Sequence, residues 1–340
     1  MTRNSLSRRT VLGCAALAGV GQALLGGPAI GAARGRIVAE EHWVTKGDVR
    51  LYVYRKRMID EAPATPKPVV FLVHGSSFSG SGGYDLQVPG HPGYSMMDNF
   101  AQRGFDVWTM DHEGYGRSTR TGSYSDISSG ADDLAAAFAL LERVTNVRAP
   151  MVYSQSGGAL RAGVFAMREP DRIGRLIFDG FSYTGDGAPE IMRRREKIDE
   201  YRKSPYRIAN VDTFRAIFSR DDPSTFEPAV AEALAAYELK LGNRVPNGTY
   251  LDMATKLPLV DPKKLAMPVQ LIRAATDGNA TDEELLTFFG LLPNKDKQFI
   301  FVSGVAHLAV LCTNRQRVFH TIEEFFRYPV GKSAESGTVS

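Results

Sequence analysis

The 340-residue sequence predicts an α/β protein built on a mostly parallel β-sheet with helices on both faces. Short runs that are apolar on both sides of a strand alternate with segments whose apolar residues recur at helical spacing. This alternation is typical of parallel strands covered by helices. With 43% hydrophobic and 23% charged residues, the composition is that of a globular protein and excludes disorder, collagen and coiled coil.

The first predicted element is an antiparallel hairpin over residues 41–57. Val49, Leu51 and Val53 point to one side of its second strand, and two tyrosines alternate with them. Residues 46–48, Lys-Gly-Asp, have the composition of a turn between the two strands.

Six buried strands and four helices follow along the chain. The strands are predicted from runs that are apolar at consecutive positions, at residues 69–73, 105–110, 151–153, 176–178, 269–272 and 299–302. The helices are predicted from apolar stripes at residues 132–144, 159–168, 282–292 and 315–326.

The regular alternation is interrupted once, which sets the predicted domain organisation. Residues 181–266 are polar and helical in pattern, with charge runs such as Arg193 to Lys197, and we expect them to form a helical cap. The α/β core then comprises residues 34–180 and 267–330, and residues 331–340 form a polar tail.

The first 33 residues resemble a twin-arginine export signal. Arg3, Arg8 and Arg9 are the only charged residues there, and an apolar run and small residues follow them up to Ala33. The run is shorter than the roughly 20 residues that span a bilayer, so we expect cleavage without a stable membrane anchor. This predicts a periplasmic or secreted protein.

Charge and cysteine content exclude several classes of partner and cofactor. Without the leader, basic and acidic residues are equal in number, so no nucleic-acid partner is expected. Cys14 lies in the leader, which leaves Cys312 without a partner for an internal disulfide. The sequence contains no dinucleotide, nucleotide-phosphate or zinc motif, so we expect neither a cofactor nor a metal.

One short motif has the context that a nucleophilic serine requires. The strand at 151–153 runs into Ser154-Gln155-Ser156-Gly157-Gly158, and a helix follows at once. A sharp turn of this kind lifts the central hydroxyl above the sheet, and it needs small residues at the positions of Ser154 and Gly158. Ordinary glycine-rich turns contain similar strings, so the motif alone is weak evidence.

Two flanking motifs strengthen this interpretation. His74-Gly75-Ser76-Ser77 follows the strand at 69–73, and an Asp-x-x-Gly-x-Gly-x-Ser string beginning at Asp111 follows the strand at 105–110. From about Val69 to Phe326 the chain therefore resembles the α/β-hydrolase family. The resemblance implies an eight-stranded mostly parallel sheet, a cap after the sixth strand, and a triad in the order nucleophile, acid, histidine.

The same resemblance assigns the remaining site residues. It places the acid in the turn after the seventh strand, at Asp277, with Asp179 after the sixth strand as the alternative; a turn aspartate that caps its own backbone would also explain Asp277. It places the catalytic base at His307, in the loop after the eighth strand.

The resemblance also implies an oxyanion hole and nearby substrate contacts. Its N–H donors would be those of Gly157 and Ser76, with Ser77 as the alternative second donor. We expect Ser77 and Gln155 to contact the substrate.

These expectations define an exported, cofactor-free serine hydrolase that cleaves a small carboxylic ester or a lactone through an acyl-enzyme intermediate. A C–C bond hydrolase or an amide hydrolase with the same triad is the alternative. A binding protein that kept the fold without turnover is a third hypothesis, which an intact triad disfavours. Acyl and alcohol specificity and the oligomeric state stay open.

Overall fold

The structure is a computed structural model that describes residues 35–60 and 66–328. The leader predicted over residues 1–33 and the tail predicted over residues 331–340 lie outside these described residues. Both therefore stay predictions.

An eight-stranded sheet forms the centre of the fold, in the order β1-β2-β4-β3-β5-β6-β9-β10. The pairs β1·β2 and β2·β4 are antiparallel, and every other pair is parallel. This confirms the predicted fold class. The strands are β1 (Gly35–Lys46), β2 (Val49–Asp60), β3 (Val69–Val73), β4 (Asp106–Met110), β5 (Met151–Gln155), β6 (Arg175–Asp179), β9 (Val269–Ala274) and β10 (Lys297–Val302).

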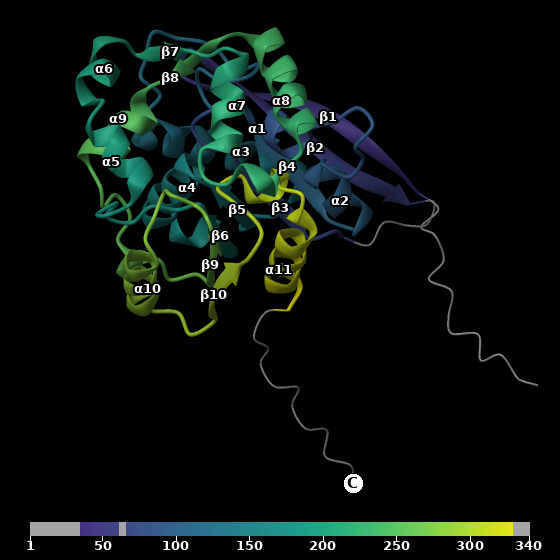
Figure 1. The fold of residues 1–340 in the computed structure, drawn as a ribbon. Helices are drawn as coiled ribbons and strands as arrows, with labels where there is room; N and C mark the ends of the chain where they lie inside the picture. Colours follow the sequence, from purple (N-terminus) through teal and green to yellow (C-terminus); the bar gives the residue numbers. More distant parts are fainter. Residues whose placement is uncertain (1–34, 61–65, 329–340) are drawn as a thin grey trace, which may run out of the picture. The chain divides into compact units, whose positions relative to one another are not determined.

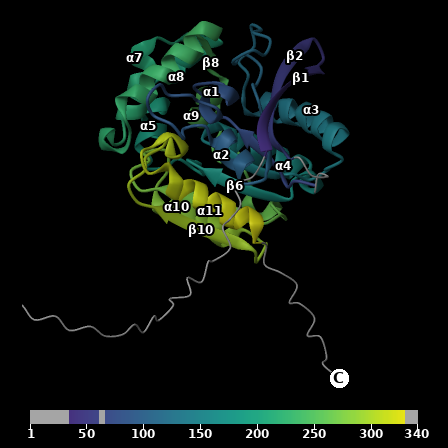
Figure 2. The same ribbon diagram turned by 90° about the vertical axis from the view of Figure 1, so that its right-hand side faces the viewer.

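The β1–β2 hairpin is longer than predicted. It pairs Gly35 with Asp60 at one end and Lys46 with Val49 at the other. The turn needs a left-handed residue, which Gly47 supplies with φ of 54°. Figure 2 shows this hairpin, in purple, beside α3 (Ile127–Thr145).

Helices cover both faces of the sheet because its strands are apolar on both sides. In β3, Val70 and Leu72 belong to one core cluster, and the other three residues belong to the second. The first cluster contains side chains of α2 (Met96–Gln102) and α11 (Arg315–Arg327). The second contains those of α3, α4 (Gly157–Arg168) and α10 (Asp282–Leu291). Helix α1 (Gly80–Tyr84) follows β3 in the chain.

Between β6 and β9 the chain leaves the sheet, in the segment predicted as the cap. Its two strands pair only with each other, antiparallel. Figure 1 shows its helices, in teal and green, gathered in the upper part of the view and apart from α10 and α11. The elements are α5 (Pro189–Arg195), α6 (Ile198–Lys203), β7 (Tyr206–Ile208), α7 (Val211–Ser219), α8 (Pro228–Leu241), β8 (Arg244–Pro246) and α9 (Gly248–Thr255).

No helix within the described ranges is both long and apolar enough to cross a membrane.

Candidate active site

Ser156 occupies a strained turn between β5 and α4. Its φ of 56° and ψ of −124° are rare for a residue other than glycine. The Ser156 N–H donates to the Asp179 carbonyl at 2.8 Å, and the side chain does not cap the helix that follows. The Oγ atom is therefore free to face the pocket above the sheet.

The turn requires small residues on both sides, as the motif predicts. A Cβ atom on Gly158 would collide with the carbonyl oxygens of Val73 and His74. On the other side, the Ser154 hydroxyl donates to the Ile177 carbonyl of β6 at 2.6 Å. Serine fits at this position because it is small and its hydroxyl bonds to the neighbouring strand.

Ser156, His307 and Asp277 meet in one chain of contacts. Ser156 Oγ lies 3.0 Å from His307 Nε2, and His307 Nδ1 lies 2.9 Å from Asp277 Oδ2. All three residues are buried, and they come from loops after β5, β10 and β9. Because Nδ1–H donates to the carboxylate, Nε2 is left as an acceptor for the serine proton. The arrangement can generate a serine nucleophile.

Charge and hydrogen bonding keep the Asp277 carboxyl ionised. Burial alone would raise its pKa, but the interaction with His307 and the N–H of Asn279, which donates to Oδ1 at 2.8 Å, lower the pKa to about 2. The side-chain nitrogen of Asn279, Nδ2, also lies 3.3 Å from His307 Nε2. Asn279 thus links the acid to the imidazole.

Asp179, the alternative acid, has another partner. Its Oδ2 accepts a hydrogen bond of 2.5 Å from the Tyr153 hydroxyl. Burial and the charge of Asp277 raise the pKa of Asp179 to about 8, against the lowering effect of Tyr153. Within the described structure, the carboxylate that contacts His307 is therefore that of Asp277.

The predicted oxyanion donors lie beside the serine. A Cβ atom on Gly75 would lie 3.2 Å from Ser156 Cβ, so the loop that carries Ser76 approaches the serine closely. Gly157 is the first residue of α4, where an N–H has no acceptor within the helix. A Cβ atom on Gly157 would collide with Ser76 Oγ, so the two predicted donors come from adjacent residues.

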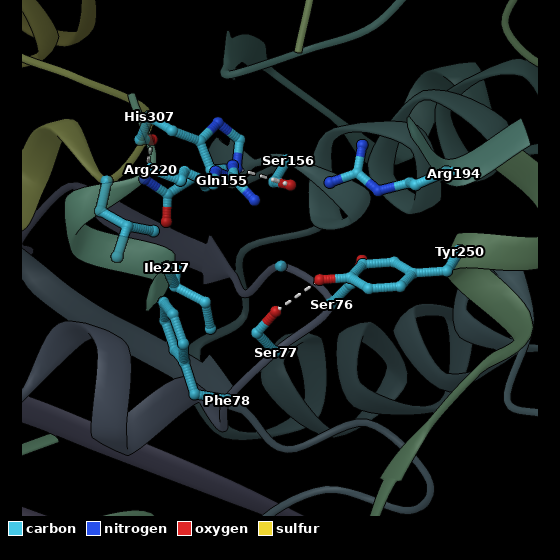
Figure 3. Close-up of a pocket in the computed structure, with 12 residues that line it drawn as sticks. Ser76, Ser77, Phe78, Gln155, Ser156, Arg194, Ile217, Arg220, Tyr250 and His307 are labelled. Atoms are coloured by element: carbon cyan, nitrogen blue, oxygen red, sulfur yellow. Dashed lines mark hydrogen bonds between the residues drawn. The ribbon is translucent and has the colours of Figure 1, made fainter. Parts of the chain in front are cut away.

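Ser77 and Gln155 both line the pocket, as predicted for substrate contacts. Ser77 Oγ lies 3.0 Å from the Tyr250 hydroxyl (Figure 3), and Gln155 Nε2 donates to the His307 carbonyl at 3.2 Å. Gln155 therefore also holds the loop of the histidine in place.

Sequence reasoning missed two arginines and a tyrosine of the pocket. Arg194, Arg220 and Tyr250 line it together with Ser156, and Figure 3 shows the Arg194 guanidinium pointing toward Ser156. Arg194 belongs to a charge run that resembles a solvated surface. The available signal is helical spacing, because Ile191 lies three positions earlier on the same buried face of α5.

The arginines dominate the electrostatics around Tyr250. Burial would raise the pKa of its phenol, but Arg207, Arg194 and Arg220 outweigh this effect and lower the pKa to about 7. Arg207 and Arg194 lie over the ring, 4.0 and 4.7 Å from its centroid. Three basic side chains therefore act on Tyr250.

In the described part of the chain, no group of three or more His, Cys, Asp or Glu side chains is placed to hold a metal ion.

Comparisons with known proteins identify the family through a family model and the fold through solved structures. A family model described as serine aminopeptidase, S33, matches residues 64–311. A structure of E-2-(acetamidomethylene)succinate hydrolase is 18% identical with a TM-score of 0.61, over 85% of this chain and 99% of that chain. An esterase from Thermogutta terrifontis is 19% identical with a TM-score of 0.60, over 85% and 98%. The carboxylesterase CesB from Bacillus subtilis is 14% identical with a TM-score of 0.60, over 86% and 93%. A search of curated proteins found no match.

Proposed function

The chain belongs to the serine aminopeptidase S33 family of α/β hydrolases, and we propose that it is a serine hydrolase that cleaves a carboxylic ester or a lactone. The observation that carries this proposal is the continuous contact chain from Ser156 through His307 to Asp277. The reaction proceeds through an acyl-enzyme intermediate on Ser156.

Acylation uses the imidazole first as a base and then as an acid. His307 Nε2 takes the Ser156 proton as Oγ bonds to the carbonyl carbon, and the carbonyl oxygen becomes an oxyanion held by the N–H groups of Ser76 and Gly157. The C–O bond to the alcohol then breaks, and His307 gives its proton to the leaving oxygen. Asp277 stabilises the positive imidazolium between these two steps.

Deacylation repeats the sequence with water. His307 takes a proton from a water molecule as the water oxygen bonds to the acyl carbon, and the Ser156–acyl bond breaks with return of the proton to Oγ. The products are a carboxylic acid and an alcohol, or a single hydroxy acid where the substrate is a lactone.

The charges of the pocket favour an ester over the substrate of an aminopeptidase. An aminopeptidase binds a cationic amino terminus, which acidic side chains recognise. The charged side chains that line this pocket beside the histidine are instead Arg194 and Arg220. Amide cleavage by the same three residues is the second candidate, and the family description favours it.

Hydrolysis of a short and a long nitrophenyl ester by the protein without residues 1–33 tests the proposal. We expect turnover by the wild-type protein and its loss, by at least about a thousandfold, in Ser156→Ala. Ser154→Ala is the matched control, because it removes a hydroxyl two residues away that bonds within the sheet. Equal turnover by wild type and Ser156→Ala would contradict the proposal.

Export through a twin-arginine pathway is a separate proposal that the leader sequence supports. Its basis is Ser7-Arg8-Arg9 followed by an apolar run and small residues to Ala33. Replacing Arg8 and Arg9 together by lysine should leave the protein in the cytoplasmic fraction. A double variant that is exported as well as the wild type would refute this route.

A further inference from the structure

Arg194 is a buried cation without a carboxylate partner among the described residues. The residue is 4% exposed, and its Nη1 donates to Asn279 Oδ1 at 3.3 Å. Glu190, on the same helix, pairs with Arg193 and Arg220 instead. A buried guanidinium without a counter-ion is costly, so its position beside Ser156 requires an explanation.

Arg220 lines the same pocket, and its guanidinium is also only partly paired. Its Nε contacts Asp221 at 3.3 Å and its Nη1 contacts Glu190 at 3.4 Å, both long for ion pairs. Its Nη2 is buried and has no hydrogen-bond partner among the residues that the structure describes. Figure 3 shows Arg220 and Arg194 on either side of Ser156.

A wider cavity of about 320 Å³ adjoins this pocket and shares Ser77, Ile217, Arg220 and Tyr250 with it. Its other charged lining residues are mostly basic: Arg193, Lys197, Arg207 and the single acid Glu200. Basic residues along a cavity raise the local concentration of anions and disfavour cations. The charged side chains of the adjoining cavity are therefore mostly positive, as are those of the pocket beside Ser156.

We propose that Arg194 and Arg220 bind a carboxylate that the substrate carries close to its scissile ester, so that the preferred substrates are esters with a free carboxylate. This inference rests on the proposed hydrolase function of the same site. It specifies the substrate class that the triad and the oxyanion hole leave open.

A carboxylate is the anion that matches the donors of the pocket. Guanidinium groups present N–H donors in a planar fork that matches carboxylate oxygens. The Tyr250 phenol, whose pKa these arginines lower, lies beside them.

Matched pairs of esters test the proposal through the ratio of kcat/KM for the anionic ester to that for the neutral ester. Monomethyl succinate against methyl butyrate places the carboxylate on the acyl side, and 3-carboxyphenyl acetate against phenyl acetate places it on the alcohol side. We expect kcat/KM to favour the anionic member of at least one pair by about tenfold to a hundredfold, the effect of a charge-assisted hydrogen bond.

Variants show whether the arginine causes the preference. Arg194→Gln should strongly reduce the preference, since only Arg220 then remains, and Arg194→Lys, which keeps the charge but loses the fork, should retain more of it. Arg202→Gln is the matched control, because it removes a cation from the neighbouring helix α6 at a side chain that is 62% exposed. An unchanged ratio in Arg194→Gln would overturn the proposal.

A binding measurement gives a readout that needs no turnover. A carboxylate at the arginines raises the pKa of Tyr250, so succinate should reduce tyrosinate absorbance near pH 8, whereas neutral succinamide should not. Tyr250→Phe should lack the signal, and Arg194→Gln should lose the response. Tyr250 is also faced by Arg207, Arg220, Tyr201 and Ser77, which are unchanged in the Arg194 variant.

The two proposals fail in distinguishable ways. Ser156-dependent turnover of neutral esters, with no anionic preference and no response to succinate, would refute only the carboxylate site. Absence of all Ser156-dependent turnover, with the succinate response intact, would refute the hydrolase function and leave the anion site.

Discussion

Asp277→Asn is the substitution whose effect is worked out most directly from the structure. It keeps the size of the side chain but removes the negative charge that lies 2.9 Å from His307 Nδ1. Two unit charges about 4 Å apart attract by about 4 kcal/mol at an effective dielectric constant near 20. Loss of this stabilisation of the imidazolium corresponds to a decrease in kcat of about a thousandfold.

Asp179→Asn is the control for this prediction. With a pKa near 8, the Asp179 carboxyl is mostly protonated at pH 7, and an amide can still accept the hydrogen bond from Tyr153. We expect kcat on a nitrophenyl ester within about threefold of wild type for this variant. The reasoning is refuted if Asp179→Asn proves more damaging than Asp277→Asn, since Asp179 would then be the acid of the site.

Two further predictions concern stability. Burial and nearby charge raise the pKa of Glu238 from 4.5 to about 7, so this group stabilises the fold fully below pH 4.5 and loses that contribution, about 3 kcal/mol, as pH rises to about 7. Urea unfolding at pH 5 and pH 8 should therefore show that Glu238→Gln loses less unfolding free energy over this interval than wild type. Equal losses in the two proteins would contradict this prediction. Gly158→Ala should cost about 1 to 3 kcal/mol of unfolding free energy and most of the activity, because its Cβ would meet backbone oxygens that cannot move away. Gly290→Ala in α10 is the matched control: no atom lies within 4 Å of its added Cβ, and a loss of stability equal to that of Gly158→Ala would refute the steric argument.

The sheet could be predicted closely because buried parallel strands are apolar on both faces. The run at residues 69–73 coincides with β3, whose five residues are all buried. Helix ends were less accurate: α3 begins at Ile127, five residues before the predicted start, because Asp126 accepts a hydrogen bond from the Ser129 N–H and caps the helix. Capping by a side chain leaves only a weak trace in an apolar pattern.

Some of the residues around Ser156 could be predicted from the sequence and others could not. His307 and Asp277 could be predicted because each follows a recognisable strand, and the structure brings both to Ser156. Arg194 and Tyr250 could not, because they lie on the inserted segment between β6 and β9. Neither residue follows a strand of the eight-stranded sheet, so their burial depends on how the helices of the segment pack.

Reaction of the protein with a serine-directed phosphonate, followed by peptide mass mapping, tests the central claim most directly. We predict one adduct per chain, located on Ser156, absent from Ser156→Ala and formed much more slowly in His307→Gln. No adduct, or an adduct on another side chain, would contradict the assignment of Ser156 as the nucleophile.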